Sequence, residues 1–134
     1  MVEKLNIDFL IEKAKSVLKN SYAPYSGVHV AAAVLTRNNS VFLGVNVENA
    51  SYGLTICAER SAISAMVTAG EREPIAVAIV TDLDNPIPPC GACRQVIAEF
   101  NLESTIIMHS VKTGETIIKS LKELFPDPFS LDHK

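Results

Sequence analysis

The sequence has no tryptophan, only three cysteines and three histidines, and no surplus of basic residues. Its 12 lysines and arginines are outnumbered by 15 aspartates and glutamates, which gives a formal net charge of −3. This balance, without a basic patch, argues against a nucleic-acid partner, because binding to phosphates relies on clustered lysine and arginine. The apolar runs are far shorter than the ~20 residues needed to cross a membrane, so no membrane partner is expected.

The first residues also lack the basic start and the continuous apolar segment of a secretory signal peptide. Without an export signal, three cysteines favour thiolate chemistry in a reducing compartment over disulfide bonds. We therefore expect a cytoplasmic protein. A length of 134 residues with 48% hydrophobic content predicts a single domain, residues 1–134, with room for one core.

All three cysteines lie in two short motifs. Cys57 opens the motif C-A-E-R, and Cys90 and Cys93 belong to P-C-G-A-C-R. Zinc prefers four tetrahedral ligands, so three thiolates leave one position open for a water, as a catalytic site requires. Glu59, two residues after Cys57, could move a proton from that water without being a ligand itself. The joint pattern is typical of zinc deaminases and predicts one catalytic Zn²⁺ per chain.

Each motif taken alone has other interpretations. A C-x-x-C pair is often redox-active or half of a structural zinc site, and a single cysteine is usually a small buried hydrophobe. A structural zinc would need a fourth ligand, and the histidines do not have a ligand-like spacing to the cysteines. The two motifs together therefore favour a catalytic metal over these alternatives.

Hydrophobic periodicity predicts an alternation of helices and strands. Helices are expected at 7–20, from Cys57 to a stop at Gly70, at 92–100 and at 121–125; strands are expected at 28–35, 41–47, 75–81, 105–109 and 114–118. The economical solution is a three-layer α/β/α fold with a mixed sheet of about five strands. The first two strands should form an antiparallel hairpin, and crossovers through helices should make neighbouring strands parallel.

Both cysteine motifs are then expected at helix N-termini. The free N–H groups and partial positive charge of such a terminus favour thiolates and lower the thiol pKa. Three thiolates (−3) and Zn²⁺ (+2) still leave one negative charge. Arg60 and Arg94 each follow a cysteine motif directly, so we expect them to balance this charge, although a random arginine more often forms a solvated salt bridge.

These motifs belong to a longer set that runs along the whole chain. The further blocks are Ala23-Pro24-Tyr25-Ser26, the stretch from Asn46 to Gly53, and Leu124-Phe125-Pro126. With them, the sequence resembles the small homotetrameric cytidine deaminases. The resemblance implies zinc-dependent hydrolysis of cytidine and deoxycytidine to uridine and deoxyuridine with release of ammonia, a reaction of pyrimidine salvage. It also implies a homotetramer whose active sites are shared between subunits.

The resemblance assigns roles to individual residues. Cys57, Cys90 and Cys93 match the zinc ligands, and Glu59 matches the group that carries protons from the water to N3 of the base and to the departing amine. The remaining matches are substrate-binding positions: Asn46 and Glu48 for the ribose 3′-hydroxyl, Ala58 for a backbone N–H that faces the base, Ala50 and Tyr52 for a neighbouring subunit's pocket, and Phe129 for an aromatic lid from another subunit. Ordinary packing is the alternative for Tyr52 and Phe129, and a polar loop is the alternative for Asn46 and Glu48.

Two positions depart from the family pattern. Val28 stands where the family usually has a phenylalanine that stacks on the pyrimidine, and Ala31 stands where glycine is common. Strand alternation places Val28 toward the pocket and His29 and Ala31 away from it, so Val28 is expected to be an aliphatic wall of the substrate site.

Three other functions stay open at this point. The chain could deaminate another aminopyrimidine nucleoside, which the valine at position 28 would allow. It could edit polynucleotides, which the negative net charge and the ribose-binding pair argue against. It could also be a zinc-stabilised binding module, in which the fourth coordination position would be closed and Glu59 would be dispensable.

Overall fold

The computed structural model describes residues 5–131, and the elements in this range follow the predicted order. The helices are α1 (Ile7–Lys15), α2 (Ala58–Thr68), α3 (Gly91–Phe100) and α4 (Leu121–Leu124). The strands are β1 (Val30–Thr36), β2 (Val41–Val45), β3 (Pro74–Thr81), β4 (Thr105–Ser110) and β5 (Thr116–Ser120). Two short 3₁₀ turns, η1 (Leu18–Asn20) and η2 (Tyr52–Leu54), lie in the loops.

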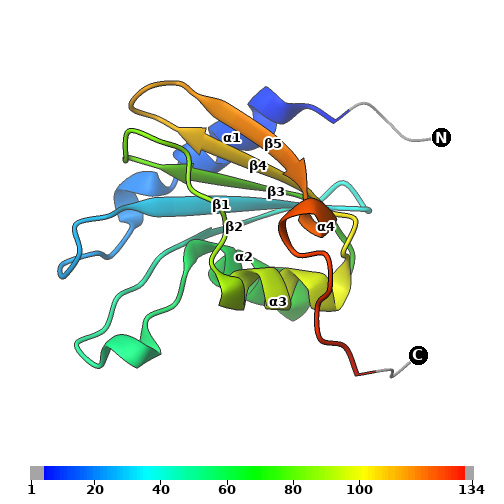
Figure 1. Cartoon of the computed structure of the whole chain (residues 1–134). Coiled ribbons are helices and arrows are strands. Elements are labelled where there is room, and N and C mark those ends of the chain that lie inside the picture. The colour runs from blue at the N-terminus through cyan, green and yellow to red at the C-terminus, as the bar shows by residue number, and fades with distance from the viewer. Residues whose placement is uncertain (1–4, 132–134) are drawn as a thin grey trace.

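The strands form one mixed sheet with the order β2-β1-β3-β4-β5 (Figure 1). The hairpin of β1 and β2 is antiparallel, as predicted, and the crossover through α3 makes β3 and β4 parallel neighbours. The prediction was wrong for the crossover through α2. That connection passes over β1, so β3 pairs with β1 in the antiparallel sense instead of lying beside β2.

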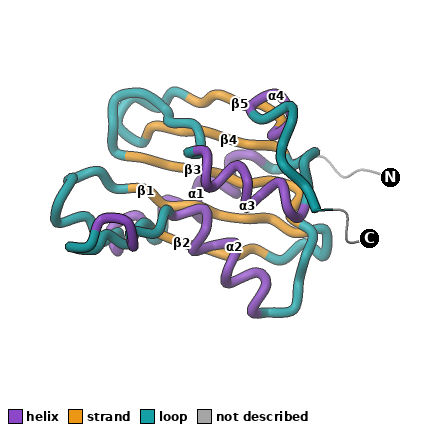
Figure 2. Tube along the Cα trace, turned by 60° about the horizontal axis from the view of Figure 1, so that its bottom comes forward, coloured by secondary structure: helices purple, strands orange, loops and turns teal. Residues whose placement is uncertain are grey.

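Helices cover both faces of the sheet, which confirms the three-layer architecture (Figures 1 and 2). One face carries α1, whose Leu10, Ile11 and Ala14 are buried. The other face carries α2, α3 and α4, whose buried side chains include Met66, Ile97 and Leu121. Strand β1 is built mainly from alanine and valine, and these small side chains let both helical layers approach it closely.

Several element boundaries differ from the predicted ones for local reasons. The first helix ends at Lys15, because the Ser16 hydroxyl donates to the carbonyl of Lys13 at 2.6 Å and competes with continued helix. Strand β1 begins only at Val30, because Gly27 turns the chain with a φ of 73°. Gly114, predicted to begin the last strand, has a φ of 80° and lies in the turn before β5.

A close contact between β2 and α2 positions the start of α2. A Cβ atom added to Gly44 would lie closer than 3.0 Å to the backbone N of Ala62, the carbonyl oxygen of Ala58 and the Cβ of Ser61. Glycine is therefore the residue that lets the helix backbone rest on the strand. This contact fixes the first turn of α2, where Cys57 and Glu59 are found.

Candidate metal centre and adjoining pocket

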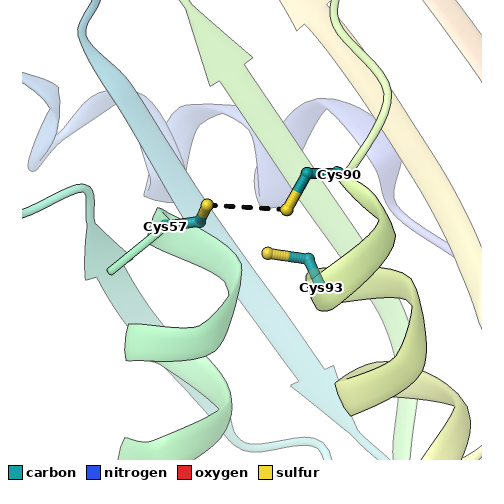
Figure 3. Close-up of side chains that lie close together, drawn as sticks. All are labelled: Cys57, Cys90 and Cys93. Atoms are coloured by element: carbon teal, nitrogen blue, oxygen red, sulfur yellow. Dashed lines mark hydrogen bonds between the residues drawn. The ribbon is translucent and has the colours of Figure 1, made fainter. Parts of the chain in front are cut away.

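The N-termini of α2 and α3 bring the three cysteines together. Cys57 is the N-cap of α2, Cys90 is the N-cap of α3, and Cys93 lies in the first turn of α3. The three side chains point toward one another in Figure 3, and their sulfurs all lie within 4.8 Å of each other. The sulfurs of Cys57 and Cys90 are 3.7 Å apart.

This spacing fits a zinc ion. Two sulfurs that each lie ~2.3 Å from a tetrahedral Zn²⁺ are about 3.8 Å apart, close to the distance observed here. N-cap positions usually hold Ser, Thr, Asp or Asn, whose oxygen accepts from a backbone N–H. The side chains of Cys57 and Cys90 make no such bond, so their sulfurs are available to a metal, and the helix termini supply positive potential to them.

The cluster polarises its own thiols. A hydrogen bond from Cys93, followed by the guanidinium of Arg60, lowers the pKa of Cys57 to about 5. The same hydrogen bond and the burial of its side chain raise the pKa of Cys93. These opposite shifts favour the thiolate form at Cys57 over Cys93. Binding of a metal would release the remaining thiol protons.

The two arginines have different surroundings. Nη2 of Arg60 lies 3.6 Å from the Cys57 sulfur and 3.4 Å from the carbonyl of Thr55, as expected for a group that balances thiolate charge. Arg94 makes its hydrogen bonds to main-chain carbonyls. Its Nε donates to Pro89 at 2.8 Å and its Nη1 donates to Leu124 at 2.7 Å, so its guanidinium ties the loop before α3 to the end of α4.

Glu59 is a carboxyl group with almost no access to solvent. It lies in the first turn of α2 and is 4% exposed. Burial, aided by the negative charge of Cys57, raises its pKa to about 7. Its side chain lines the same pocket as Cys57 and Cys90, so a buried carboxyl group and two of the three cysteines share one cavity.

That pocket has a volume of about 280 Å³. Besides Cys57, Cys90 and Glu59, its wall includes five substrate-binding residues that the sequence predicted: Val28, Asn46, Glu48, Ala58 and Tyr52. Sequence reasoning missed Val30, Ile87 and Pro88, which add aliphatic surface. The alternation of β1 could have pointed to Val30, two residues after Val28. Nothing in the local pattern of the loop 82–89 pointed to Ile87.

Glu48 is held by the loop that follows Ala23. Its Oε1 accepts from the backbone N–H of Tyr25 at 2.9 Å and of Ser26 at 3.0 Å, and its Oε2 accepts from the Ser26 hydroxyl. The hydroxyl bond from Ser26 is the main reason why the pKa of Glu48 lies below its usual range. Glu48 is therefore an ionised acceptor with a fixed orientation, although it is only 4% exposed.

Comparison with known proteins gives one consistent result. The family model for the cytidine and deoxycytidylate deaminase zinc-binding region matches residues 5–109. The chain belongs to this family. A curated cytidine deaminase of Halalkalibacterium halodurans is 42% identical over 123 residues, which cover 92% of this chain and 93% of the relative.

Solved structures of cytidine deaminases agree with this family membership. The cytidine deaminase from Burkholderia pseudomallei superposes with a TM-score of 0.88 at 43% identity and covers 93% of this chain and 100% of its own. The cytidine deaminase from Mycobacterium tuberculosis superposes with a TM-score of 0.82 at 34% identity and covers 96% and 100%. The fold predicted from the sequence is thus confirmed.

In this member of the deaminase family, three predicted substrate-binding residues lie on the surface of the chain. Tyr52 is 61% exposed and lines the mouth of the pocket. Ala50 is exposed, and Phe129 is 71% exposed; neither belongs to the pocket wall of its own chain. The carbonyl of Phe129 accepts from Nε2 of Gln95 at 2.9 Å, which fastens the C-terminal segment to α3.

Proposed function

We propose that this chain is a zinc-dependent hydrolase that converts cytidine and deoxycytidine to uridine and deoxyuridine with release of ammonia, as in pyrimidine salvage. One observation carries the proposal: sulfurs of the metal cluster, the buried Glu59 and the pair Asn46 and Glu48 all open onto one pocket. The names of the relatives support the same reaction. The 134 residues would act as a single domain.

Cys57, Cys90 and Cys93 would hold one zinc ion, which fits the spacing of their sulfurs. When bound, zinc supplies a Lewis acid that lowers the pKa of a water. Arg60 would offset part of the thiolate charge through its contact with Cys57. Arg94 would act indirectly, because its bonds to Pro89 and Leu124 hold the loop that presents Cys90.

Glu59 would transfer protons during the reaction. Its carboxylate would take a proton from the attacking water and deliver it to N3 of the cytosine ring. It would then protonate the departing amine, so that cytidine and water give uridine and ammonia. A pKa near neutrality suits a group that must accept and return protons, and the burial that raises this pKa also excludes bulk water.

The rest of the pocket would hold the nucleoside. Asn46 and Glu48 would bind the 3′-hydroxyl of the sugar, and the backbone N–H of Ala58, at the first position of α2, would face the base. Val28 and Ile87 would form aliphatic walls around the pyrimidine. A free nucleoside does not have to be extruded from a duplex, so no nucleic-acid partner is required.

We further propose a homotetramer in which Ala50, Tyr52 and Phe129 complete the pockets of neighbouring subunits. The exposure of the Tyr52 and Phe129 rings supports this, because large exposed apolar side chains are suited to an interface. Light scattering should then give a mass of about four chains, as the family resemblance implies, and a monomeric mass would refute the assembly.

No helix between residues 5 and 131 has the length and apolar character needed to cross a membrane. A cytoplasmic location is our proposal, and it is supported by three free cysteines gathered in one site, which a reducing compartment keeps in the thiol form.

Ultraviolet-monitored deamination of cytidine tests the function. The purified protein should convert cytidine to uridine, and a zinc chelator should abolish the conversion until zinc is restored. Replacement of Cys57, Cys90 or Cys93 by alanine should remove the metal, which metal analysis can measure directly. Turnover that survives complete removal of zinc would refute the proposal.

A further inference from the structure

The amide of Asn46 is held on three sides by its own chain. Its Oδ1 accepts from the backbone N–H of Val30 at 3.1 Å and from the Ser21 hydroxyl, and its Nδ2 donates to the carbonyl of Val28 at 2.8 Å. A backbone N–H can only donate and a backbone carbonyl can only accept. These two main-chain partners therefore fix which end of the amide carries the oxygen.

This orientation sets the direction of the next two hydrogen bonds. Because Oδ1 faces Ser21, the Ser21 hydroxyl must donate its single proton to Asn46. Nδ1 of His29 lies 3.0 Å from the same hydroxyl oxygen. Since the hydroxyl has no second proton, Nδ1 of His29 must be the donor. The order is thus His29 to Ser21 to Asn46.

His29 is itself fastened to the sheet. Its backbone N–H donates to Oδ1 of Asp82 at 3.1 Å, and its carbonyl accepts from Oγ1 of Thr81 at 3.2 Å and from the N–H of Asp82 at 3.3 Å. Thr81 is the last residue of β3. The backbone of His29 is therefore held by the end of β3, and its ring contacts Ser21 from this fixed position.

These bonds leave Asn46 with one free hydrogen-bonding position. Both lone pairs of Oδ1 and one proton of Nδ2 are used, so only the second N–H remains for a ligand. Glu48, which lines the same pocket, can only accept when ionised. A hydroxyl group that accepts from Asn46 and donates to Glu48 matches both.

We propose that Ser21 and His29 are positioning residues for sugar recognition, which hold Asn46 so that its one free N–H meets a hydroxyl of the substrate. The inference rests on the proposed function, because it takes Asn46 as a ligand of the nucleoside sugar. Neither Ser21 nor His29 lines the pocket, so both would act through Asn46.

Steady-state kinetics of Ser21→Ala and His29→Phe test the proposal. Each variant should raise the KM for cytidine about three- to tenfold, the size of one neutral hydrogen bond, with little change in kcat. The penalty should largely vanish for 2′,3′-dideoxycytidine, which lacks the 3′-hydroxyl. Ser21→Thr and His29→Gln keep the donors and should behave like the wild type.

His109→Phe is the matched control. Nδ1 of His109 lies 2.8 Å from the Thr116 hydroxyl in the same kind of contact, but on β4 and outside the pocket wall. This variant should leave both KM values unchanged. An unchanged KM for cytidine in Ser21→Ala, or an equal loss for the dideoxy substrate, would overturn the proposal.

A spectroscopic measurement decides the hydrogen-bond order without enzyme activity. Long-range ¹H–¹⁵N spectra of histidine-labelled protein report which ring nitrogen carries the proton, and the sequence has only three histidines to assign. Neutral His29 should be protonated on Nδ1, and Ser21→Ala should shift that signal but not the signal of His109. A proton on Nε2 with a bare Nδ1 would refute the positioning role. If the wild type instead fails to deaminate cytidine, the proposed function fails while this spectrum still tests the bonds.

Discussion

At the scale of single residues, the chemistry depends on where Glu59 lies. The carboxyl is 4% exposed, lies in the first turn of α2 and shares its pocket with Cys57 and Cys90. Burial would penalise a permanent negative charge there, and its raised pKa shows that penalty. A buried carboxyl at such a position is more readily explained by proton transfer than by packing.

We predict that Glu59→Gln retains zinc and fold but loses most of its activity. Glutamine keeps the size and polarity of the side chain but cannot take up and return a proton, and such groups typically contribute ~10²–10⁴-fold to the rate. The measurement is kcat for cytidine together with zinc content and melting temperature. Glu12→Gln, on the exposed surface of α1, is the control and should remain fully active. Near-normal turnover of Glu59→Gln would contradict the proton-transfer role.

We also predict that Val28→Phe tightens the binding of cytidine. Val28 is half-buried in the pocket wall, and valine offers less area than phenylalanine and no π face for stacking. Stacking of a base on an aromatic ring contributes ~1–3 kcal/mol in nucleic-acid complexes, so KM should fall by about tenfold, with kcat nearly unchanged.

Overpacking is the competing effect of the larger ring, and it would cost ~1–3 kcal/mol of stability. The melting temperature therefore has to be measured beside KM, and Val41→Phe, at the far end of β2, serves as the control. A Val28→Phe protein as stable as the wild type with an unchanged or higher KM would show that residue 28 does not contact the base.

At the scale of elements, the metal cluster could be predicted because the signals for it, the cysteine motifs and the helix starts, are close together in the sequence. Each cysteine motif stands directly before an amphipathic run, so both helix starts and their shared chemistry follow from spacing. The positions of Ala50 and Phe129 relative to a pocket cannot be obtained in this way. In one chain they lie on the surface, and their proposed partners belong to other subunits.

Side-chain hydrogen bonds between distant segments also could not be predicted from local sequence patterns. The anchoring of Glu48 by Tyr25 and Ser26 joins residues that are 22 and 23 positions apart, and the Ser21 and Asn46 contact joins residues 25 apart. The identity of Arg94 suggested a charge-balancing group. Only the tertiary structure shows that its Nε and Nη1 donate to the carbonyls of Pro89 and Leu124.

The contact between β2 and α2 gives a prediction at this scale. Gly44→Ala should destabilise the protein by about 1–3 kcal/mol or more, because the added methyl group meets backbone atoms of α2 that cannot move independently. Gly53→Ala is the control, since a Cβ there meets nothing within 4 Å. Urea denaturation at equal protein concentration measures both. Equal midpoints for the two variants would show that α2 can shift away from the strand without cost.

At the scale of the whole molecule, the fold class followed from the sequence but the strand order did not. Alternating helical and strand patterns indicate a layered α/β protein, whereas pairing between β1 and β3 depends on which edge of the hairpin the crossover reaches. That choice places the start of β1, the loop after β2 and the two helix starts around one pocket. The metal cluster then joins two helices that the chain connects only through β3.

We therefore predict that zinc stabilises the folded molecule in addition to supporting its activity. A ligand that binds only the folded state contributes about 2.7 kcal/mol when its free concentration is about 100 times Kd. For a chain of this size each kcal/mol corresponds to about 4 °C, so chelation should lower the melting temperature by about 10 °C and added zinc should restore it. A reducing agent must be present, because the freed thiols of Cys57 and Cys90 lie close enough to oxidise. Cys57→Ala is the control, since a protein without the site should not respond to the chelator. Equal melting temperatures of zinc-free and zinc-loaded wild type, with metal content verified by elemental analysis, would show that the helix starts are held in place by packing alone.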